Sequence, residues 1–205
     1  MQIDTQTRPV RIFIGLKIDP DIASQLAALT AELKATSVRR VAPADIHLTL
    51  VPPWREASID QVIERLRHAA GALPSFPLKF QHLGYGPQPR RPTLVWVDCA
   101  ATDAVAVLRN TLMQAFGQED SRPFRPHVTL ARIRSGDRSF PRKHPINKDL
   151  NLGQAVRSVE LFQSPPPGAT GYQILASAQL AGADAAADRP PFPGYNRLIS
   201  NSSQE

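Results

Sequence analysis

A short motif, in which a histidine and a threonine alternate with aliphatic residues, occurs twice in this chain. The first copy is His47-Leu-Thr-Leu50 and the second is His127-Val-Thr-Leu130. Side chains of a β-strand point alternately to its two faces, so each copy places its histidine and threonine together, opposite its two aliphatic residues. Each copy therefore predicts a strand with one face in the core and an imidazole and a hydroxyl on the other face. Because the copies lie far apart in the chain, the two imidazoles can meet only if two halves of one domain face each other across a groove.

Two simpler interpretations compete with a paired site. A lone histidine in a strand is usually a surface or half-buried residue without chemistry, but the repetition of the whole motif favours a shared role. A histidine-based metal site needs three or more well-placed ligands. The sequence offers one cysteine and no cluster of histidine and glutamate at ligand spacing. It therefore predicts neither a bound metal nor another cofactor.

Length and composition indicate a globular chain. Its 205 residues are enough for one domain or two small lobes with a real core. The sequence contains no apolar run long enough to span a membrane, and its first residues lack the pattern of an export signal. Cys99 is the single cysteine and cannot form an internal disulfide, which suits a reducing compartment. We expect a cytoplasmic monomer with one bilobed domain over residues 1–182, followed by a disordered or loosely docked tail over 183–205.

Positive charge is concentrated around the second motif. The whole chain carries a formal charge of +6, whereas the stretch from Arg122 to Lys148 has eight basic residues and one acidic residue, Asp137. Such a patch favours polyanions, with nucleic acid first among them. A solvated basic loop without a partner is the alternative interpretation.

Apolar periodicity predicts the secondary structure. Strands are expected at 10–18, 38–41, 46–51, 77–82, 92–99, 127–133, 155–162 and 172–180, and helices at 22–35, 58–72 and 103–116. Pro52-Pro53 is expected to end the third strand, because proline cannot donate to a ladder. Residues 135–151 are expected to form a polar loop with room for one helical turn. Strand pairs separated by single helices predict an α+β fold with antiparallel sheets and outer helices.

The paired motifs, His47-Leu-Thr-Leu50 and Pro126-His-Val-Thr-Leu-Ala-Arg132, resemble those of the 2H phosphoesterase superfamily. Within it, the chain is most similar to the RNA 2′,3′-cyclic phosphodiesterase group, also called the 2′-5′ RNA ligase family. The resemblance covers roughly residues 10–181. It implies two pseudo-symmetric lobes of antiparallel sheet with outer helices around a central cleft, each lobe presenting one motif strand. One departure follows the first motif, where this chain has Val51-Pro-Pro-Trp54 in place of Phe-Leu-Gly.

The resemblance also implies roles for the site residues. His47 is expected to act as the catalytic acid and His127 as the catalytic base, while Thr49 and Thr129 bind the phosphate. Arg132 is a further candidate phosphate ligand. It lies five residues after His127, so a regular strand would point it away from the cleft, and only a bulge or a strand end would return it. Outside the motifs, Trp54 and Phe124 are candidates either for stacking a base or for the core.

The residues also support this chemistry directly. Hydrolysis of a cyclic phosphodiester needs a base for water on one side of phosphorus and an acid for the leaving ribose oxygen on the other. Two imidazoles can supply both near neutral pH, and threonine hydroxyls can donate to the phosphoryl oxygens. The expected partner is RNA or a nucleotide with a 2′,3′-cyclic phosphate. Two alternatives stay open: 2′-5′ RNA ligation by the reverse chemistry, and a non-catalytic RNA-binding module.

Overall fold

The computed structural model describes residues 8–33, 37–89, 91–134, 139–166 and 169–182. The tail expected over 183–205 lies outside these residues, as does Arg138 of the basic stretch. The strands are β1 (Val10–Lys17), β2 (Val38–Arg40), β3 (His47–Glu56), β4 (Phe76–Gly86), β5 (Leu94–Cys99), β6 (His127–Ile133), β7 (Lys148–Val156), β8 (Ser158–Gln163) and β9 (Gln173–Gln179). The helices are α1 (Pro20–Ala28), α2 (Ile59–Gly71), α3 (Asp103–Ala115) and α4 (Phe140–Lys143), with a 3₁₀ turn over Pro43–Asp45.

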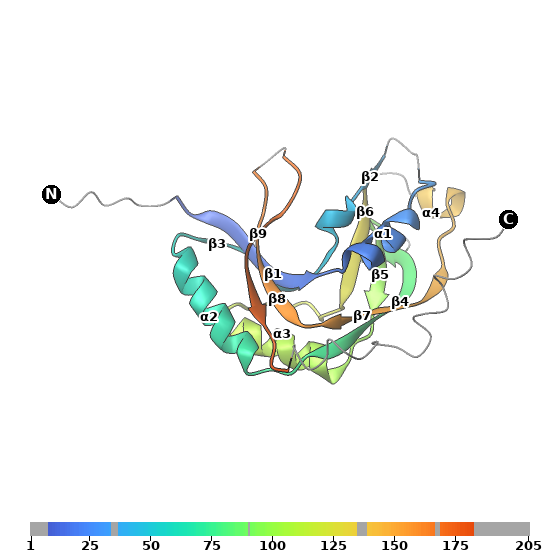
Figure 1. The fold of residues 1–205 in the computed structure, drawn as a ribbon. Helices are drawn as coiled ribbons and strands as arrows, with labels where there is room; N and C mark the ends of the chain where they lie inside the picture. Colours follow the sequence, from blue (N-terminus) through green and yellow to red (C-terminus); the bar gives the residue numbers. More distant parts are fainter. Residues whose placement is uncertain (1–7, 34–36, 90, 135–138, 167–168, 183–205) are drawn as a thin grey trace.

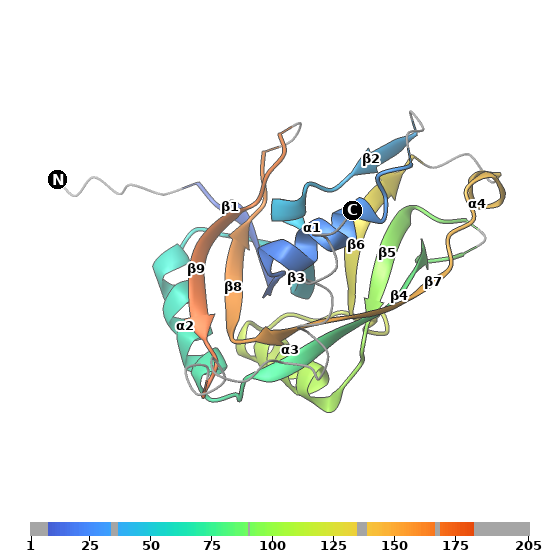
Figure 2. The same ribbon diagram turned by 45° about the vertical axis from the view of Figure 1, so that its right-hand side comes forward.

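The named strands of the described residues form one antiparallel sheet, which confirms the predicted α+β class. Its order is β7-β4-β5-β6-β3-β1-β8-β9, and β2 pairs with β6 off this path. The two motif strands, β3 and β6, are neighbours at the centre, where Leu48 pairs with Val128. On either side of this junction lie three more strands, so β3-β1-β8-β9 mirrors β6-β5-β4-β7 (Figures 1 and 2). The two expected lobes are therefore the halves of one continuous sheet.

Three amphipathic helices cover the sheet and form the core with it. α2 packs against β8, β9 and α3, while α3 also packs against β3 (Figure 1). α1 lies against β7 in the other half. The helices bury residues at helical spacing, among them Leu26, Leu66, Leu108 and Leu112, each at most 1% exposed. Full burial of such a side chain contributes about 1.5–3 kcal/mol, so packing on the sheet stabilises these helices. In the described part of the chain, no helix is long and apolar enough to cross a membrane.

The first helix is shorter than its apolar pattern predicted. α1 ends at Ala28, and Leu29 and Thr30 continue in tighter turns that bond back three residues. The Thr30 hydroxyl donates to the carbonyl of Ala27, a local bond that competes with continuation of the helix. The prediction of a helix to residue 35 is therefore wrong at its C-terminal end.

The third strand does not end at Pro52-Pro53, and that prediction is also wrong. β3 continues to Glu56 and pairs with β1 as far as Val10. Its register against β1 shifts on either side of Ile14, opposite the region of the two prolines. Because β6 pairs with β3 only near Leu48, the rest of β3 has an open edge on that side. Proline is tolerated at edges and bulges, where no ladder donor is required.

The C-terminal strands differ from the prediction in number and limits. Residues 148–151 belong to β7 rather than to a loop, and the expected strand at 155–162 is divided at Arg157 between β7 and β8. In β7, half-buried Leu150 and Leu152 alternate with exposed Asp149 and Asn151. This strand is stable because β4, which extends to Gly86, supplies its hydrogen-bonding partner over most of its length.

Candidate active site

The central junction brings the two motifs into one cavity. It has a volume of about 420 Å³ and is lined by His47, Thr49, His127, Thr129 and Arg132 among others. The aliphatic members of both motifs are at most 1% exposed, while the histidines and threonines are half-buried on the other face. The predicted alternation is therefore present in both copies. The structure brings all five of the predicted site residues together, on strands that are neighbours in the sheet.

A β-bulge turns Arg132 into the cavity. Val95 of β5 pairs with Ala131 of β6, but the next residue, Trp96, pairs with Thr129, which leaves Leu130 as an extra residue. The extra residue reverses the alternation, so Thr129 and Arg132 share the cavity side. A bulge is one of the two ways to obtain this orientation that the sequence predicted.

The first motif has the same irregularity without the cation. Gly15 of β1 pairs with Thr49 and Ile14 pairs with Val51, so Leu50 is the extra residue of β3. The position that corresponds to Arg132 is Pro52. The two halves of the site thus match in imidazole and hydroxyl, while the guanidinium at this position comes from the second half alone.

Both imidazoles are held by the same backbone contact. Nδ1 of His47 lies 2.7 Å from the carbonyl oxygen of Asp45, and Nδ1 of His127 lies 2.7 Å from that of Arg125. A carbonyl can only accept, so Nδ1 carries the hydrogen and donates in both rings. In the neutral form, each Nε2 then keeps its lone pair. Both rings can accept a proton at Nε2 or, once charged, donate one there.

Burial lowers the pKa of both histidines. For His47, the carbonyl and the carboxylate of Asp45 oppose this effect, whereas Arg132 and His127 add to the lowering. For His127, burial is opposed by the carbonyl of Arg125 and by the charge of Asp98. Desolvation thus favours the neutral form of both rings, and the positive charge of Arg132 further disfavours protonation of His47. A bound phosphate would act in the opposite direction and help one ring hold its proton.

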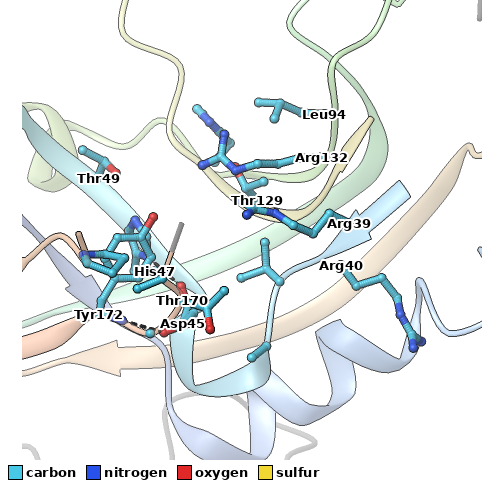
Figure 3. A pocket seen from close by; sticks show the side chains of 16 residues that line it. Arg39, Arg40, Asp45, His47, Thr49, Leu94, Thr129, Arg132, Thr170 and Tyr172 are labelled. Carbon is cyan, nitrogen blue, oxygen red and sulfur yellow. Dashed lines mark hydrogen bonds between the residues drawn. The ribbon is translucent and has the colours of Figure 1, made fainter. Parts of the chain in front are cut away.

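Aromatic side chains surround His47. The rings of Phe13 and Tyr172 each lie 4.8 Å from it, and Tyr172 meets it edge-on. The backbone N–H of Tyr172 donates to the carboxylate of Asp45 over 2.9 Å. Asp45 thereby connects the start of the first motif with the segment before β9 (Figure 3). Tyr172 is not predictable as a site residue from the sequence, because nothing near it in the chain indicates contact with the first motif.

His127 packs on a tryptophan that an arginine covers. Trp96 lies 4.3 Å from the imidazole and is 4% exposed. The guanidinium of Arg125 lies 4.8 Å from the Trp96 ring and forms two 2.8 Å hydrogen bonds with the carboxylate of Asp98. Arg122 is similarly paired with Asp120. The local positive charge is therefore smaller than the basic stretch from Arg122 to Lys148 indicated.

The short strand β2 adds two cations to the site that were not predicted from the sequence. Arg39 and Arg40 of β2 border the cavity, because β2 pairs with β6. Neither predicted stacking residue belongs to the cavity wall. Trp54 packs near Phe116 and Phe124 lies under the guanidinium of Arg109. Within the ranges that the structure describes, no group of three or more His, Cys, Asp or Glu side chains is placed to hold a metal ion.

The fold and this site define a class of protein in which two histidine-threonine motifs, on neighbouring central strands of one sheet, place a pair of imidazoles in a central cavity. The chain belongs to the 2′-5′ RNA ligase superfamily, whose family model matches residues 18–151. This finding confirms the resemblance inferred from the two motifs.

Curated relatives and solved structures agree with this assignment. The RNA 2′,3′-cyclic phosphodiesterase of Bacillus subtilis (strain 168) is 27% identical over 176 residues, which is 82% of this chain and 96% of the relative. The RNA 2′,3′-cyclic phosphodiesterase of Archaeoglobus fulgidus is 24% identical over 147 residues, covering 69% and 78%. The crystal structure of E. coli LigT complexed with NADP+ superposes with a TM-score of 0.66 at 26% identity over 84% of this chain and 98% of that chain. A protein of Thermus thermophilus shares the fold, with a TM-score of 0.68 at 20% identity over 83% and 97%.

Proposed function

We propose that this protein hydrolyses the 2′,3′-cyclic phosphate of RNA or of a nucleotide to a 2′-phosphate, with its two histidines as acid and base and without a metal. The observation that carries the proposal is the pair of imidazoles in one cavity, each with Nδ1 donating to a carbonyl and Nε2 available. The curated relatives are named RNA 2′,3′-cyclic phosphodiesterases, which supports hydrolysis of such a phosphate.

The reaction balances with the groups of the cavity. Nε2 of His127 accepts a proton from water as the water oxygen bonds to phosphorus. The bond between phosphorus and O3′ breaks, and protonated His47 donates its Nε2 proton to O3′, so the product is a 2′-phosphate with a free 3′-hydroxyl. Thr49, Thr129 and Arg132 can donate to the non-bridging oxygens, where negative charge increases in the transition state. Proton transfer by such positioned groups typically contributes about 10²–10⁴-fold each.

The negative charge of the bound substrate opposes the lowering of the histidine pKa values by burial. In the free protein, burial lowers the pKa of both rings. A phosphodiester bound between them carries a negative charge, which favours an imidazolium beside it. His47 can then be protonated when the substrate is bound, as the acid must be.

The family name includes RNA ligation, which opens the same cyclic phosphate with a different acceptor. If the 5′-hydroxyl of a second RNA takes the place of water, the attack yields a 2′-5′ linkage by way of the same two rings. We propose hydrolysis as the principal activity, because water is the more abundant acceptor in an exposed cavity. Ligation is measured on the same protein with a 5′-hydroxyl RNA as the added acceptor.

The proposed activity can be tested on purified protein with a panel of RNA and nucleotide 2′,3′-cyclic phosphates in EDTA. Phosphorus NMR identifies the product, and we expect the 2′-phosphate. A 3′-phosphate product would contradict the direction of ring opening. Turnover that EDTA abolishes and added metal restores would contradict the two-histidine mechanism. RNA binding without any turnover would support the binding-module alternative instead.

The acid and base roles can be separated by the leaving group. His47→Ala and His127→Ala should each remove nearly all turnover, whereas His68→Ala, on the exposed face of α2, is the matched control and should have no effect. A cyclic phosphate with sulfur in place of O3′ releases a thiolate, which needs no acid. This substrate should partly restore activity to His47→Ala and not to His127→Ala. Rescue of the second variant alone would reverse the two roles.

A further inference from the structure

Two arginines of the cavity wall face each other across a pair of strands. Arg39 of β2 and Arg132 of β6 are directly opposite in the antiparallel register, and both line the cavity. Figure 3 shows their side chains extending next to each other. Like charges at opposed positions destabilise a pair of strands. A bound anion would relieve the repulsion between the two guanidiniums, which the pairing of the strands does not relieve.

The protein does not supply that negative charge within its described residues. Over those ranges, neither Arg39 nor Arg132 forms an ion pair with a carboxylate. The acidic residue of the cavity wall is Asp45, whose carboxylate accepts the N–H of Tyr172. We therefore expect the compensating charge to arrive with a ligand.

The neighbouring arginine behaves differently. Arg40 follows Arg39 in β2, but its guanidinium donates to the carbonyl of Ala31 over 3.3 Å. In Figure 3 its side chain points away from the other two. Both arginines border the cavity, but the guanidinium of Arg40 is engaged by the turn after α1, whereas Arg39 lies opposite Arg132. The two residues form a matched pair for experiments on charge.

We propose that Arg39 forms a second anion subsite, which binds the phosphate on O5′ of the nucleotide whose cyclic phosphate is hydrolysed. This inference rests on the proposed function, in which Arg132 faces the reacting phosphate. Paired strands lie about 4.8 Å apart, so guanidiniums at opposed positions are close enough to hold two phosphates that one ribose joins. The substrate class is then an RNA 3′ end or a 5′-phosphorylated nucleotide rather than a bare nucleoside cyclic phosphate.

The test compares substrates that differ only in this charge. The first is a dinucleotide with a terminal 2′,3′-cyclic phosphate, and the second replaces its linking phosphodiester by an uncharged methylphosphonate. A nucleoside 2′,3′-cyclic phosphate with and without a 5′-phosphate forms the other pair, which distinguishes a chain linkage from a terminal phosphate. The readout is the ratio of kcat/KM within each pair, for the parent protein and for Arg39→Gln, Arg40→Gln and Arg67→Gln.

The parent protein should prefer the charged member of at least one pair by roughly tenfold or more, as expected for a charge-assisted contact. Arg39→Gln should bring that ratio close to one, because the loss of kcat/KM should fall mainly on the charged members. Arg67→Gln, on exposed α2, removes the same charge far from the site and should match the parent. Arg40→Gln should keep the parent's ratio. If Arg40→Gln lowered the ratio as much as Arg39→Gln, the preference would come from the overall positive charge of the cavity and not from a subsite at Arg39.

An unchanged ratio in Arg39→Gln, or an equal loss on all substrates, would overturn the subsite. A failure of the proposed function gives a different result, since no substrate would then be turned over by the parent protein. In that case the dissociation constants of the two dinucleotides are compared in the same variants. Discrimination by the parent that Arg39→Gln abolishes would support the subsite, and its absence would refute it.

Discussion

Replacement of Gly15, which does not line the cavity, by alanine should lower both the stability of the protein and its kcat. Gly15 lies on β1, next to the first motif, and a Cβ built there would be 2.5 Å from the carbonyl oxygen of Leu48. Ordinary contact begins at 3.4 Å, so about 0.9 Å must be gained by moving backbone. Leu48 lies between His47 and Thr49 and is also the residue that pairs with Val128 across the central junction. The displacement therefore acts on both the first motif and its spacing from the second.

The expected losses follow from that displacement. Overpacking of a well-packed core typically costs about 1–3 kcal/mol of unfolding free energy. Reduced freedom of the unfolded chain returns about 0.4–1 kcal/mol, which is too little to cancel it. A misplacement of about 1 Å can cost on the order of 10²-fold in rate. We expect Gly15→Ala to lose both stability and kcat.

Two control variants separate position from stability. Gly71→Ala has nothing within 4 Å of the new Cβ and lies at the end of α2, so it should be neutral or slightly stabilising. Leu66→Ala, at a fully buried position of α2, should lose about 2–5 kcal/mol but keep kcat at temperatures where it is folded. Urea unfolding and steady-state kinetics on a cyclic phosphate measure both quantities. If Gly15→Ala kept kcat within twofold, or if Leu66→Ala lost it equally, the spacing of the motifs would not be what limits the rate.

Three further outcomes are expected. Because the base must be neutral and the acid protonated, kcat/KM should be bell-shaped in pH; burial lowers the pKa of both His47 and His127 from the ordinary 6.5, so the maximum should lie below that value, and a maximum above it would contradict the assignment. Thr49→Val and Thr129→Val keep the branched shape and remove one donor, so each should lower kcat by on the order of 10²-fold or less, and no change in either would exclude a contact with the transition state. Burial raises the pKa of Glu160 above its ordinary 4.5, so the folded state holds its proton to higher pH than the unfolded chain. The unfolding free energy should therefore fall as pH rises from the ordinary pKa of the glutamate to its raised pKa in the folded protein. Glu160→Gln should flatten that slope in urea titrations at several pH values.

The candidate site was predictable as far as local pattern extends. Alternation along each motif strand follows from backbone geometry, so the buried aliphatic residues and the cavity-facing histidines and threonines were readable in the sequence. Arg132 was readable only in part, because its orientation depends on the extra residue Leu130 in β6. That bulge exists in relation to the partner strand β5, and a single strand's sequence does not specify it.

Two of the errors in secondary structure, both in strands, have a common origin. Pro52-Pro53 and the polar start of β7 at Lys148 both favour chain breaks by local preference. In the structure, an open edge accommodates the prolines, and pairing with β4 compensates for the weak β preference of the polar residues. Tertiary context overrides local propensity at such sites, because the ladder partner contributes more than the residue's own preference.

The sequence by itself determined the antiparallel α+β class, the places of the three long helices apart from the end of α1, and the faces of the two motif strands, since these depend on periodicity within short windows. The tertiary structure decided which side chains share the cavity. It paired Leu48 with Val128, set Arg39 opposite Arg132, brought Tyr172 to His47 and neutralised Arg125 with Asp98. The physical reason is that an alternation of period two specifies a face without specifying a neighbour. Which strands pair, and in which register, depends on packing of the whole sheet and its helices.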